Sequence, residues 1–259
     1  MNPMPQLAPT LRQLRLSGVL DSLETRTKQA VADQISHIDF LAMLLQDEVA
    51  RREQKKLATR IRRGNFRPDK TLETYDFAFN PLMNRAMIQD LATCRFIEER
   101  APVVIVGPCG TGKSHIAQAL ANLAARKGYD VLFTNQTRLF GTLQEARLTN
   151  TFDRKLAMLA KLDLLIIDDF GIKPLRNPQD EDLHELIAER YERKSTIITS
   201  NLDLPEWSQA LPNKLLGAAT IDRIKHGAYI LTLEGESYRT ARPPQERKAS
   251  KKAGAKEAE

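Results

Sequence analysis

Residues 103–114 read VVIVGPCGTGKS and hold the strongest structural signal in this chain. The β-branched run Val103–Val106 predicts a short buried strand. The residues that follow, Gly107–Ser114, fit the pattern G-x-x-x-x-G-K-[ST] in full, and an apolar helical pattern begins directly after them. In this strand–turn–helix context, glycines let backbone N–H groups turn inward around phosphate groups, beside the partial positive charge of a helix N-terminus. The stretch therefore predicts a phosphate-binding loop within an α/β fold.

The same loop predicts a site for ATP and Mg²⁺. Lys113 is placed to reach the β- and γ-phosphates, and the Ser114 hydroxyl is placed to complete the coordination of Mg²⁺. The residues expected to bind the nucleotide are Gly107, Pro108, Cys109, Gly110, Thr111, Gly112, Lys113, Ser114 and His115.

Polar residues also follow two later strands. The apolar run Leu164–Ile167 ends in Asp168 and Asp169, which places both carboxylates at the C-terminal edge of a sheet, beside the phosphate loop. We expect Asp168 to hold Mg²⁺ through water and Asp169 to polarise the attacking water. Asn201 closes the next strand on the same edge, where its amide can orient that water.

Alternating strands and helices predict the architecture. Short β-branched runs at 103–106, 131–134, 164–167, 196–199 and 229–233 are separated by helical patterns at 113–127, 137–147, 152–161, 180–193 and roughly 205–216. Strands that alternate with helices indicate a parallel sheet with helices on both faces.

A small all-helical domain is expected over residues 1–70. Leucines from Leu11 to Leu23 recur at helical spacing, with Gly18 as a weak point, and a second helix is predicted from Ser36 to near Gly64. The stretch from Pro68 to Asn80 resembles a linker. We therefore expect a helical domain at 1–70, an ATPase domain at 71–240 and a disordered basic tail at 241–259.

Composition and charge limit where the protein can be located and which partners it can bind. The chain has 259 residues, 42% of them hydrophobic, with two cysteines. Its apolar stretches are too short for a membrane span, its N-terminus lacks the features of a secretion signal, and two cysteines cannot make a disulfide framework, so we expect a soluble cytoplasmic protein. Positive charge is concentrated at the ends: residues 1–75 hold 13 Lys and Arg against 9 Asp and Glu, and residues 241–259 hold 6 against 3. Such ends fit a polyanionic partner, although a solvated helix face and tail would give the same pattern.

The second predicted helix ends in a basic stretch. We expect its cations to contact the phosphates of DNA: Arg51, Arg52, Lys55, Lys56, Arg60, Arg62 and Arg63. Two alternatives remain open at this point. Charges at the end of a helix are often only a solvated face, and loops of the core could contact DNA instead.

Together, the motifs resemble a known family. The segments GPCGTGKSHIAQALA, LLIIDDFG, ERYERKSTIITSNL and ATIDRI, in this order, resemble the AAA+ ATPases. More closely, they resemble the IstB-like helper ATPases of insertion sequences, whose nearest relatives are the DnaC-type helicase loaders. The resemblance covers residues 5–240. It implies an AAA+ P-loop ATPase core with a parallel sheet flanked by helices, preceded by the small helical domain.

The resemblance also implies roles for single residues. Lys113 and Ser114 match the phosphate-loop lysine and hydroxyl, Asp168 and Asp169 match the Mg²⁺ and water-activating carboxylates, and Asn201 matches sensor 1. Most AAA+ proteins have Glu where this chain has Asp169, which implies slow or partner-stimulated hydrolysis.

Three further matches lie outside the central motifs. Arg223 matches the arginine finger that reaches the γ-phosphate of a neighbouring subunit. Phe79 and Asn80 match the segment that lines the adenine pocket. Arg239 matches a sensor-2-like position, although a surface arginine fits the sequence there equally well.

Members of the resembled family bind double-stranded DNA without marked sequence preference, assemble on it as ATP-dependent homo-oligomers and recruit a partner transposase. Two rival functions remain. A DnaC-like helicase loader would prefer single strands and need its helicase. A small-molecule P-loop kinase would act as a monomer. It would give no function to Arg223 or to the basic N- and C-terminal segments.

Overall fold

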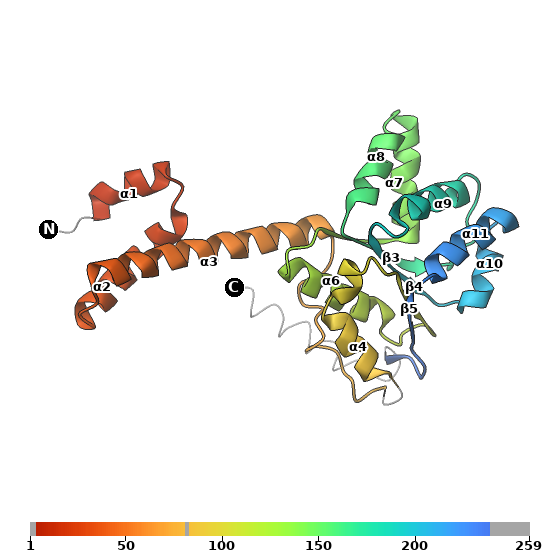
Figure 1. The fold of residues 1–259 in the computed structure, drawn as a ribbon, viewed down its shortest axis with the longest axis horizontal. Coiled ribbons are helices and arrows are strands. Elements are labelled where there is room, and N and C mark those ends of the chain that lie inside the picture. The colour runs from red at the N-terminus through yellow and green to blue at the C-terminus, as the bar shows by residue number, and fades with distance from the viewer. Residues whose placement is uncertain (1–3, 81–82, 239–259) are drawn as a thin grey trace, which may run out of the picture. The chain divides into compact units, whose positions relative to one another are not determined.

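The computed structural model describes residues 4–80 and 83–238 (Figure 1). The chain divides into two compact units, Met1–Arg60 and Ile61–Glu259. This boundary lies earlier than the one expected at residue 70, because the residues after the first unit already pack on the second. Phe66 is buried, and the side-chain amide of Asn65 donates to the carbonyl oxygen of Phe133 at 3.1 Å. That residues 1–70 form an independent domain stays a prediction.

The first unit contains three helices: α1 (Met4–Gln13), α2 (Ser17–Ala32) and most of α3 (His37–Gly64). The single helix expected across Leu11–Leu23 is wrong, because the chain breaks between α1 and α2. Arg15 adopts a left-handed backbone with φ +56°, and the Leu16 N–H donates to the Leu11 carbonyl oxygen at 2.8 Å. This is a Schellman ending that uses arginine where glycine is usual, so no glycine announces it in the sequence.

The helix α3 begins directly after Ser36, as expected. The Ser36 hydroxyl oxygen accepts the backbone N–H of Asp39 at 3.2 Å, and the helix ends at Gly64. Val19, Leu23 and Leu44 form the small buried core between α2 and α3.

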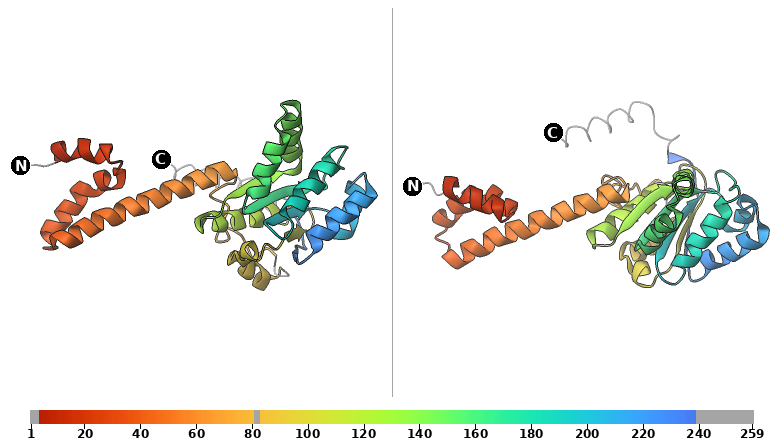
Figure 2. Two further views of the ribbon diagram at one scale, coloured as in Figure 1. Left: turned by 45° about the horizontal axis from the view of Figure 1, so that its top comes forward. Right: turned by 90° about the horizontal axis from the view of Figure 1, so that it is seen from above.

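The second unit is built on a five-stranded sheet with the order β2-β3-β4-β1-β5. All four strand pairs are parallel. The strands are β1 (Val103–Val106), β2 (Val131–Asn135), β3 (Leu164–Phe170), β4 (Ser195–Ser200) and β5 (Tyr229–Thr232). Helices lie on both faces of the sheet (Figure 2), and the inner strands β1 and β4 are buried along their whole length. The predicted α/β fold class is therefore confirmed.

The helices of the second unit are α4 (Arg85–Ala92), α5 (Arg95–Glu98), α6 (Lys113–Arg126), α7 (Gln136–Leu148), α8 (Phe152–Lys161), α9 (Gln179–Arg190), η1 (Leu204–Glu206), α10 (Trp207–Ala210) and α11 (Lys214–Lys225). The helix expected over 205–216 is wrong. Leu211 is extended because Pro212 follows it, and α11 starts anew behind Asn213, whose side chain accepts the Leu216 N–H at 3.1 Å. No helix in the described parts of the chain is long and apolar enough to cross a bilayer.

The stretch from Pro68 to Asn80, expected to be a linker, packs instead against α6 and the glycine-rich loop. The side-chain amide of Asn122 on α6 donates to the carbonyl oxygens of Arg67 and Lys70, each at 2.8 Å. A run without helical or strand periodicity is thus held in place by single polar contacts, which periodicity does not reveal.

The strand order brings the predicted motifs together. Because β1 lies between β4 and β5, and β3 lies beside β4, the ends of β1, β3 and β4 meet at one edge of the sheet. Open parallel sheets bind ligands outside this C-terminal edge.

Candidate functional site

Two glycines give the loop between β1 and α6 its shape. Gly107 has φ +141°, and a Cβ there would lie 2.0 Å from the carbonyl oxygen of Leu233. Gly112 has φ +97°, and a Cβ there would lie 2.7 Å from the ring of Tyr75. Neither position tolerates another residue without strain. The loop is therefore enclosed by the segment that follows β5 and by the segment that precedes α4.

The predicted phosphate-binding lysine lies against this loop. Lys113 is buried, and its Nζ donates to the carbonyl oxygens of Gly107 and Pro108 at 2.7 Å each. Both acceptors are neutral, whereas phosphate oxygens are charged and accept stronger hydrogen bonds from an ammonium group. The geometry therefore fits a lysine that can exchange these carbonyls for the phosphates of a nucleotide.

Asp168 joins three elements behind the loop. Its Oδ1 accepts the Thr199 hydroxyl of β4 at 2.5 Å, and it also forms a hydrogen bond with Ser114 at the start of α6. Burial raises the pKa of Asp168, although the hydrogen bonds from Thr199 and Ser114 oppose this effect. A hydroxyl and a carboxylate side by side are oxygen ligands of the kind that Mg²⁺ prefers. Ser114 and Asp168 thus fit the predicted ion.

Thr199 has a role that no sequence motif predicts. Its hydroxyl donates to Asp168 and accepts the backbone N–H of Asp169 at 3.1 Å, so it fixes both carboxylate residues. Asp169 needs such a hold because its backbone is left-handed, with φ +59°. The only signal for Thr199 was a polar residue at the end of a buried strand.

A cavity of about 560 Å³ lies at this edge of the sheet. Its wall includes the loop residues Cys109–His115, together with Asp169 and Asn201. The structure therefore brings most of the expected nucleotide site together around one space, with Asp169 and Asn201 at the wall and the buried Asp168 behind it.

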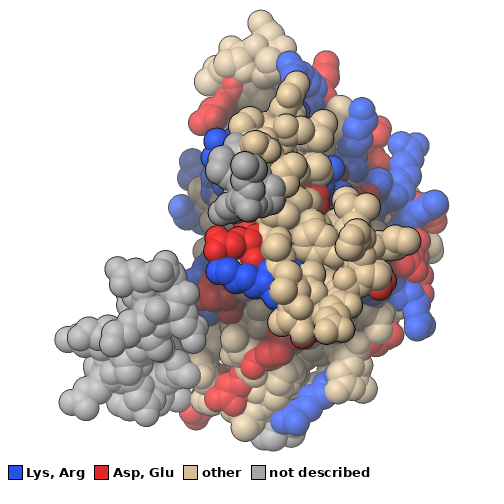
Figure 3. Space-filling view, turned by 90° about the vertical axis from the view of Figure 1, so that its left-hand side faces the viewer, with Lys and Arg blue, Asp and Glu red and all other residues tan. Residues whose placement is uncertain are grey.

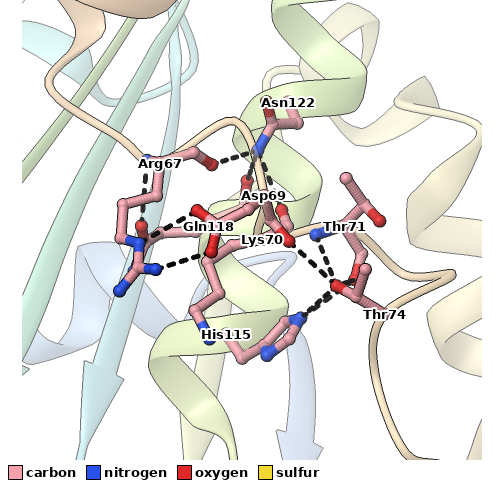
Figure 4. A network of polar contacts seen from close by, with 8 residues as sticks. All are labelled: Arg67, Asp69, Lys70, Thr71, Thr74, His115, Gln118 and Asn122. Carbon is pink, nitrogen blue, oxygen red and sulfur yellow. Dashed lines mark hydrogen bonds and ion pairs between the residues drawn. The ribbon is translucent and has the colours of Figure 1, made fainter. Parts of the chain in front are cut away.

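The segment before α4 supplies further wall residues that the sequence analysis did not identify: Arg67, Lys70, Thr74, Tyr75 and Asp76. Figure 4 shows how part of this segment is attached to α6. His115 donates from Nε2 to the carbonyl oxygen of Thr71 at 2.9 Å, and burial lowers the pKa of its ring. His115 therefore holds the segment in place as well as lining the cavity.

Tyr75 carries the same segment onto the glycine-rich loop. Its hydroxyl donates to the carbonyl oxygen of Thr111 at 3.0 Å, and burial raises the pKa of the phenol to about 12. A neutral Tyr75 thus covers one side of the loop over the whole range of physiological pH.

Phe79 and Asn80, expected at an adenine pocket, have different surroundings. Phe79 lines the cavity and meets the ring of Tyr238 edge-on, with ring centroids 4.9 Å apart. Asn80 is buried, and its side-chain amide donates to the carbonyl oxygen of Glu234 at 2.5 Å. Phe79 therefore faces the cavity, while Asn80 holds the segment that follows β5.

Comparison with known proteins identifies the family. Residues 9–246 match the family described as IstB-like ATP binding protein. An ATP-binding protein in an insertion sequence of Mycobacterium tuberculosis is 36% identical over 241 residues, which cover 93% of this chain and 96% of that protein. The chain belongs to the IstB-like ATP-binding protein family. The ATP-binding protein of insertion sequence IS21 from Pseudomonas aeruginosa is 34% identical, covering 91% of this chain and 89% of that protein.

Solved structures show the fold that this IstB-like chain shares. The crystal structure of the DnaC helicase loader superposes with a TM-score of 0.51 and 26% identity, covering 58% of this chain and 89% of that one. AMPPCP-bound DnaA from Aquifex aeolicus superposes with a TM-score of 0.56 and 20% identity, covering 66% of this chain and about half (52%) of DnaA. The second unit therefore has the AAA+ P-loop ATPase fold.

Arg223 of this IstB-like chain lies apart from the phosphate-loop cavity. It lines a second cavity of about 560 Å³, whose wall includes residues that directly precede strands: Pro102 before β1, Lys194 before β4 and Ala228 before β5. That cavity is therefore at the N-terminal edge of the sheet, whereas the loop is at the C-terminal edge. The guanidinium of Arg223 donates to the carbonyl oxygen of Ala219 on its own helix at 3.3 Å.

The basic residues expected to contact DNA fall into two groups. Three form ion pairs: Arg51 with Asp21, Arg52 with Glu48 at 2.6 Å, and Lys56 with Glu53 at 2.9 Å. Within the described residues, four others form no ion pair: Lys55, Arg60, Arg62 and Arg63. The positive charges of the second group are not neutralised by an ion pair, so this group is better suited to contact a phosphate. Arg239 and the tail 241–259 lie outside the described residues.

Proposed function

We propose that this IstB-like protein is an ATP-dependent helper of transposition. It binds duplex target DNA largely without sequence preference, assembles on it as a homo-oligomer and delivers it to a partner transposase, and ATP hydrolysis regulates the assembly. The observation that carries the proposal is the match to insertion-sequence ATP-binding proteins over about nine-tenths of the chain, together with the family match over residues 9–246.

The residues around the cavity support ATP binding and hydrolysis. Bound Mg²⁺ supplies positive charge that offsets the charge of the phosphates. Ser114 and Asp168 would hold the ion, and Lys113 would bind the terminal phosphates. Asp169 would accept a proton from the attacking water, which Asn201 would orient.

The position of Arg223 supports assembly. A side chain at the N-terminal edge of the sheet does not share a cavity with the phosphate loop of its own chain. An arginine that stabilises the charge of a transferred phosphoryl group can instead be supplied by a neighbouring subunit. In this proposal, ATP binding and subunit contact depend on each other.

The test is duplex-DNA binding and particle size, measured with ATP, with ADP and without nucleotide. We expect large assemblies on duplex DNA only with ATP. Asp169→Asn should keep these assemblies longer than the wild type, because hydrolysis is slowed while Lys113 still binds the nucleotide. Lys113→Ala serves as the control that should form none. A wild-type protein that stays monomeric on duplex DNA with ATP would contradict the proposal.

The second candidate is a helicase loader, favoured by the structural match to the DnaC helicase loader. This function predicts preference for single-stranded DNA and a requirement for a replicative helicase. Repeating the same binding measurement with single strands separates the two candidates.

A further inference from the structure

Charge alone does not single out Arg223 among the surface arginines of this chain. On the face drawn in Figure 3, lysines and arginines (blue) lie among aspartates and glutamates (red). Arg223 differs in its place, because it is half-buried in the last turn of α11, three residues after the buried Thr220. Its guanidinium donates to the Ala219 carbonyl oxygen at 3.3 Å and is thus tied to its own helix. The position of α11 therefore determines where the guanidinium lies.

The helix α11 packs on the second unit through one face. Its buried residues are Gly217, Thr220 and Ile224, which are spaced by three and four residues. Gly217 lies against Leu211, and Ile224 belongs to the apolar core. Apolar contacts have no preferred direction, so they hold a helix against a core without fixing its rotation. The hydroxyl of Thr220 can supply a directional contact on this face.

His184 of α9 makes that contact. Its Nδ1 lies 2.9 Å from the Thr220 hydroxyl oxygen, which lies 2.8 Å from the Leu216 carbonyl oxygen. A carbonyl oxygen can only accept, so the hydroxyl donates its one proton to Leu216 and accepts the Nδ1–H of His184. Burial and the positive charge of Arg223 both lower the pKa of the imidazole. At neutral pH the ring is therefore uncharged, with its proton on Nδ1.

The helix α9, which carries His184, is itself held by buried polar contacts on both sides of this residue. Asp182 is buried and pairs with Arg147 of α7. Arg190 is buried and donates to the Thr196 hydroxyl of β4 at 2.9 Å. Figure 1 shows α9 and α11 side by side. His184 thus donates from a firmly held helix to the helix that carries the arginine.

We propose that His184 is a positioning residue for the arginine that acts on a neighbouring subunit. It acts through Thr220, which fixes α11 on α9 and thereby sets where Arg223 meets the phosphates bound by the next subunit. The inference rests on the action of Arg223 in trans that is proposed above. A charge that is already in position needs no reorganisation at the moment of reaction, whereas a displacement of about 1 Å can cost about a hundredfold in rate.

The test mixes two variants of the full-length chain in the presence of ATP and duplex DNA. Lys113→Ala subunits supply the arginine and Arg223→Ala subunits supply the intact phosphate loop, so hydrolysis above the sum of the two measures the action of Arg223 in trans. His184→Leu in the Lys113→Ala chain should lower this activity by at least about fivefold. The same substitution in the Arg223→Ala chain is the control. It should leave the activity unchanged, because that chain has no arginine to position.

Two further variants separate positioning from general damage to the fold. His184→Asn can present an amide N–H to Thr220 in place of the Nδ1–H, so we expect it to retain most of the activity in the Lys113→Ala chain. Thr220→Val removes the acceptor and should lower the activity as His184→Leu does. Combining the two substitutions should cause little further loss, since both remove one hydrogen bond.

Hydrogen exchange tests the contact without any assembly. In the protein without nucleotide or DNA, His184→Leu should speed the exchange of backbone amides in α11, and His184→Asn should not. Unchanged exchange in His184→Leu would overturn the proposal, as would equal loss of activity from both placements or loss from neither. If the parent mixture hydrolyses no more ATP than the sum of its two variants, the action of Arg223 in trans is wrong, and the positioning role is wrong with it.

Discussion

At the scale of single residues, Arg190 is the side chain that simple burial rules explain least. It is 1% exposed, and its guanidinium donates to the carbonyl oxygens of Leu159 at 2.7 Å and Leu162 at 2.9 Å, and to the Thr196 hydroxyl at 2.9 Å. It also donates to the carbonyl oxygen of Ser195. Burial lowers its pKa to about 9. One cation thus joins the end of α8, the end of α9 and the start of β4.

Replacing Arg190 should therefore cost much stability. Arg190→Met keeps the length of the side chain but leaves several buried carbonyl groups without donors, so we expect a loss of about 3 kcal/mol in the free energy of unfolding. Arg193→Met is the control, because Arg193 is exposed and pairs with Glu189 at the surface, and we expect a change within about 0.5 kcal/mol. Urea unfolding measures both. Equal midpoints for the two variants would contradict the structural role of Arg190.

At the scale of helices, α2 and α3 lie close together at Gly18. The carboxylate of Glu48 on α3 accepts the backbone N–H of Gly18 at 2.6 Å and thus caps α2 from the neighbouring helix. A Cβ on Gly18 would lie 2.7 Å from the Cα of Glu48. A glycine within a helical pattern predicts a weak point in one helix, whereas in the structure Gly18 has a packing role near the start of α2.

This contact predicts opposite effects for the same substitution at two helical glycines. Gly18→Ala should destabilise the α2–α3 pair by about 1–3 kcal/mol, because overpacking outweighs the helix propensity of alanine. Gly141→Ala in α7, where a Cβ would meet nothing within 4 Å, should stabilise its helix by about 0.5–1 kcal/mol. Hydrogen exchange read by mass spectrometry resolves the two regions. Slower exchange in α2 of the Gly18→Ala variant would show the close approach to be wrong.

The same helix pair should respond to acid. Hydrogen bonds from Arg26 and Ser22 lower the pKa of Asp47 to about 2 from an ordinary 3.8. A carboxylate with a lowered pKa in the folded state stabilises that state above its ordinary pKa, and this stabilisation is lost as the pH falls through the folded value. We therefore expect the α2–α3 contact to weaken between about pH 4 and pH 2.

An NMR titration of the Asp47 carboxyl group tests this assignment. Arg26→Gln should raise the pKa of Asp47 toward its ordinary value, because the ion pair at 2.8 Å is removed. Lys28→Gln is the control, since Lys28 pairs with Glu24 instead. If the two variants titrate alike at Asp47, the ion pair with Arg26 is not the cause.

An element can be predicted from the sequence when a whole run of residues determines it, and is missed when one or two residues do. The inner strands β1, β3 and β4 were predictable because parallel strands covered on both faces contain runs of apolar, often β-branched residues. The break at Arg15 and the restart at Asn213 depend on one or two residues, and the stretch from Pro68 to Asn80 depends on single hydrogen bonds to α6. Such contacts have no period, so the sequence pattern of residues 68–80 predicts a linker although the segment is packed.

At the scale of the whole molecule, the parallel sheet explains why the sequence could place several motifs at one edge of the sheet. The sequence could not predict every distance between the motifs. The phosphate loop follows β1, Asp168 lies near the end of β3 and Asn201 follows β4, and a parallel sheet brings the ends of its strands to one edge. Arg223 lies in the last turn of α11 instead, and only the structure shows it at the other edge of the sheet, in a separate cavity. Because Arg223 is far from the nucleotide cavity of its own chain, its role can be tested by mixing two variant subunits.

If Arg223 acts on the nucleotide of a neighbour, two inactive variants should complement each other. Lys113→Ala removes the phosphate contact but leaves Arg223 intact, and Arg223→Ala does the reverse. We expect each alone to hydrolyse ATP at least about tenfold more slowly than the wild type in the presence of duplex DNA. In a mixture, a subunit with an intact loop can lie beside a subunit with an intact arginine, so activity should rise above the sum of the two. Mixing Lys113→Ala with a Lys113→Ala, Arg223→Ala double variant is the control and should stay inactive. A mixture of the two single variants as inactive as this control would place the action of Arg223 within its own chain or outside hydrolysis altogether.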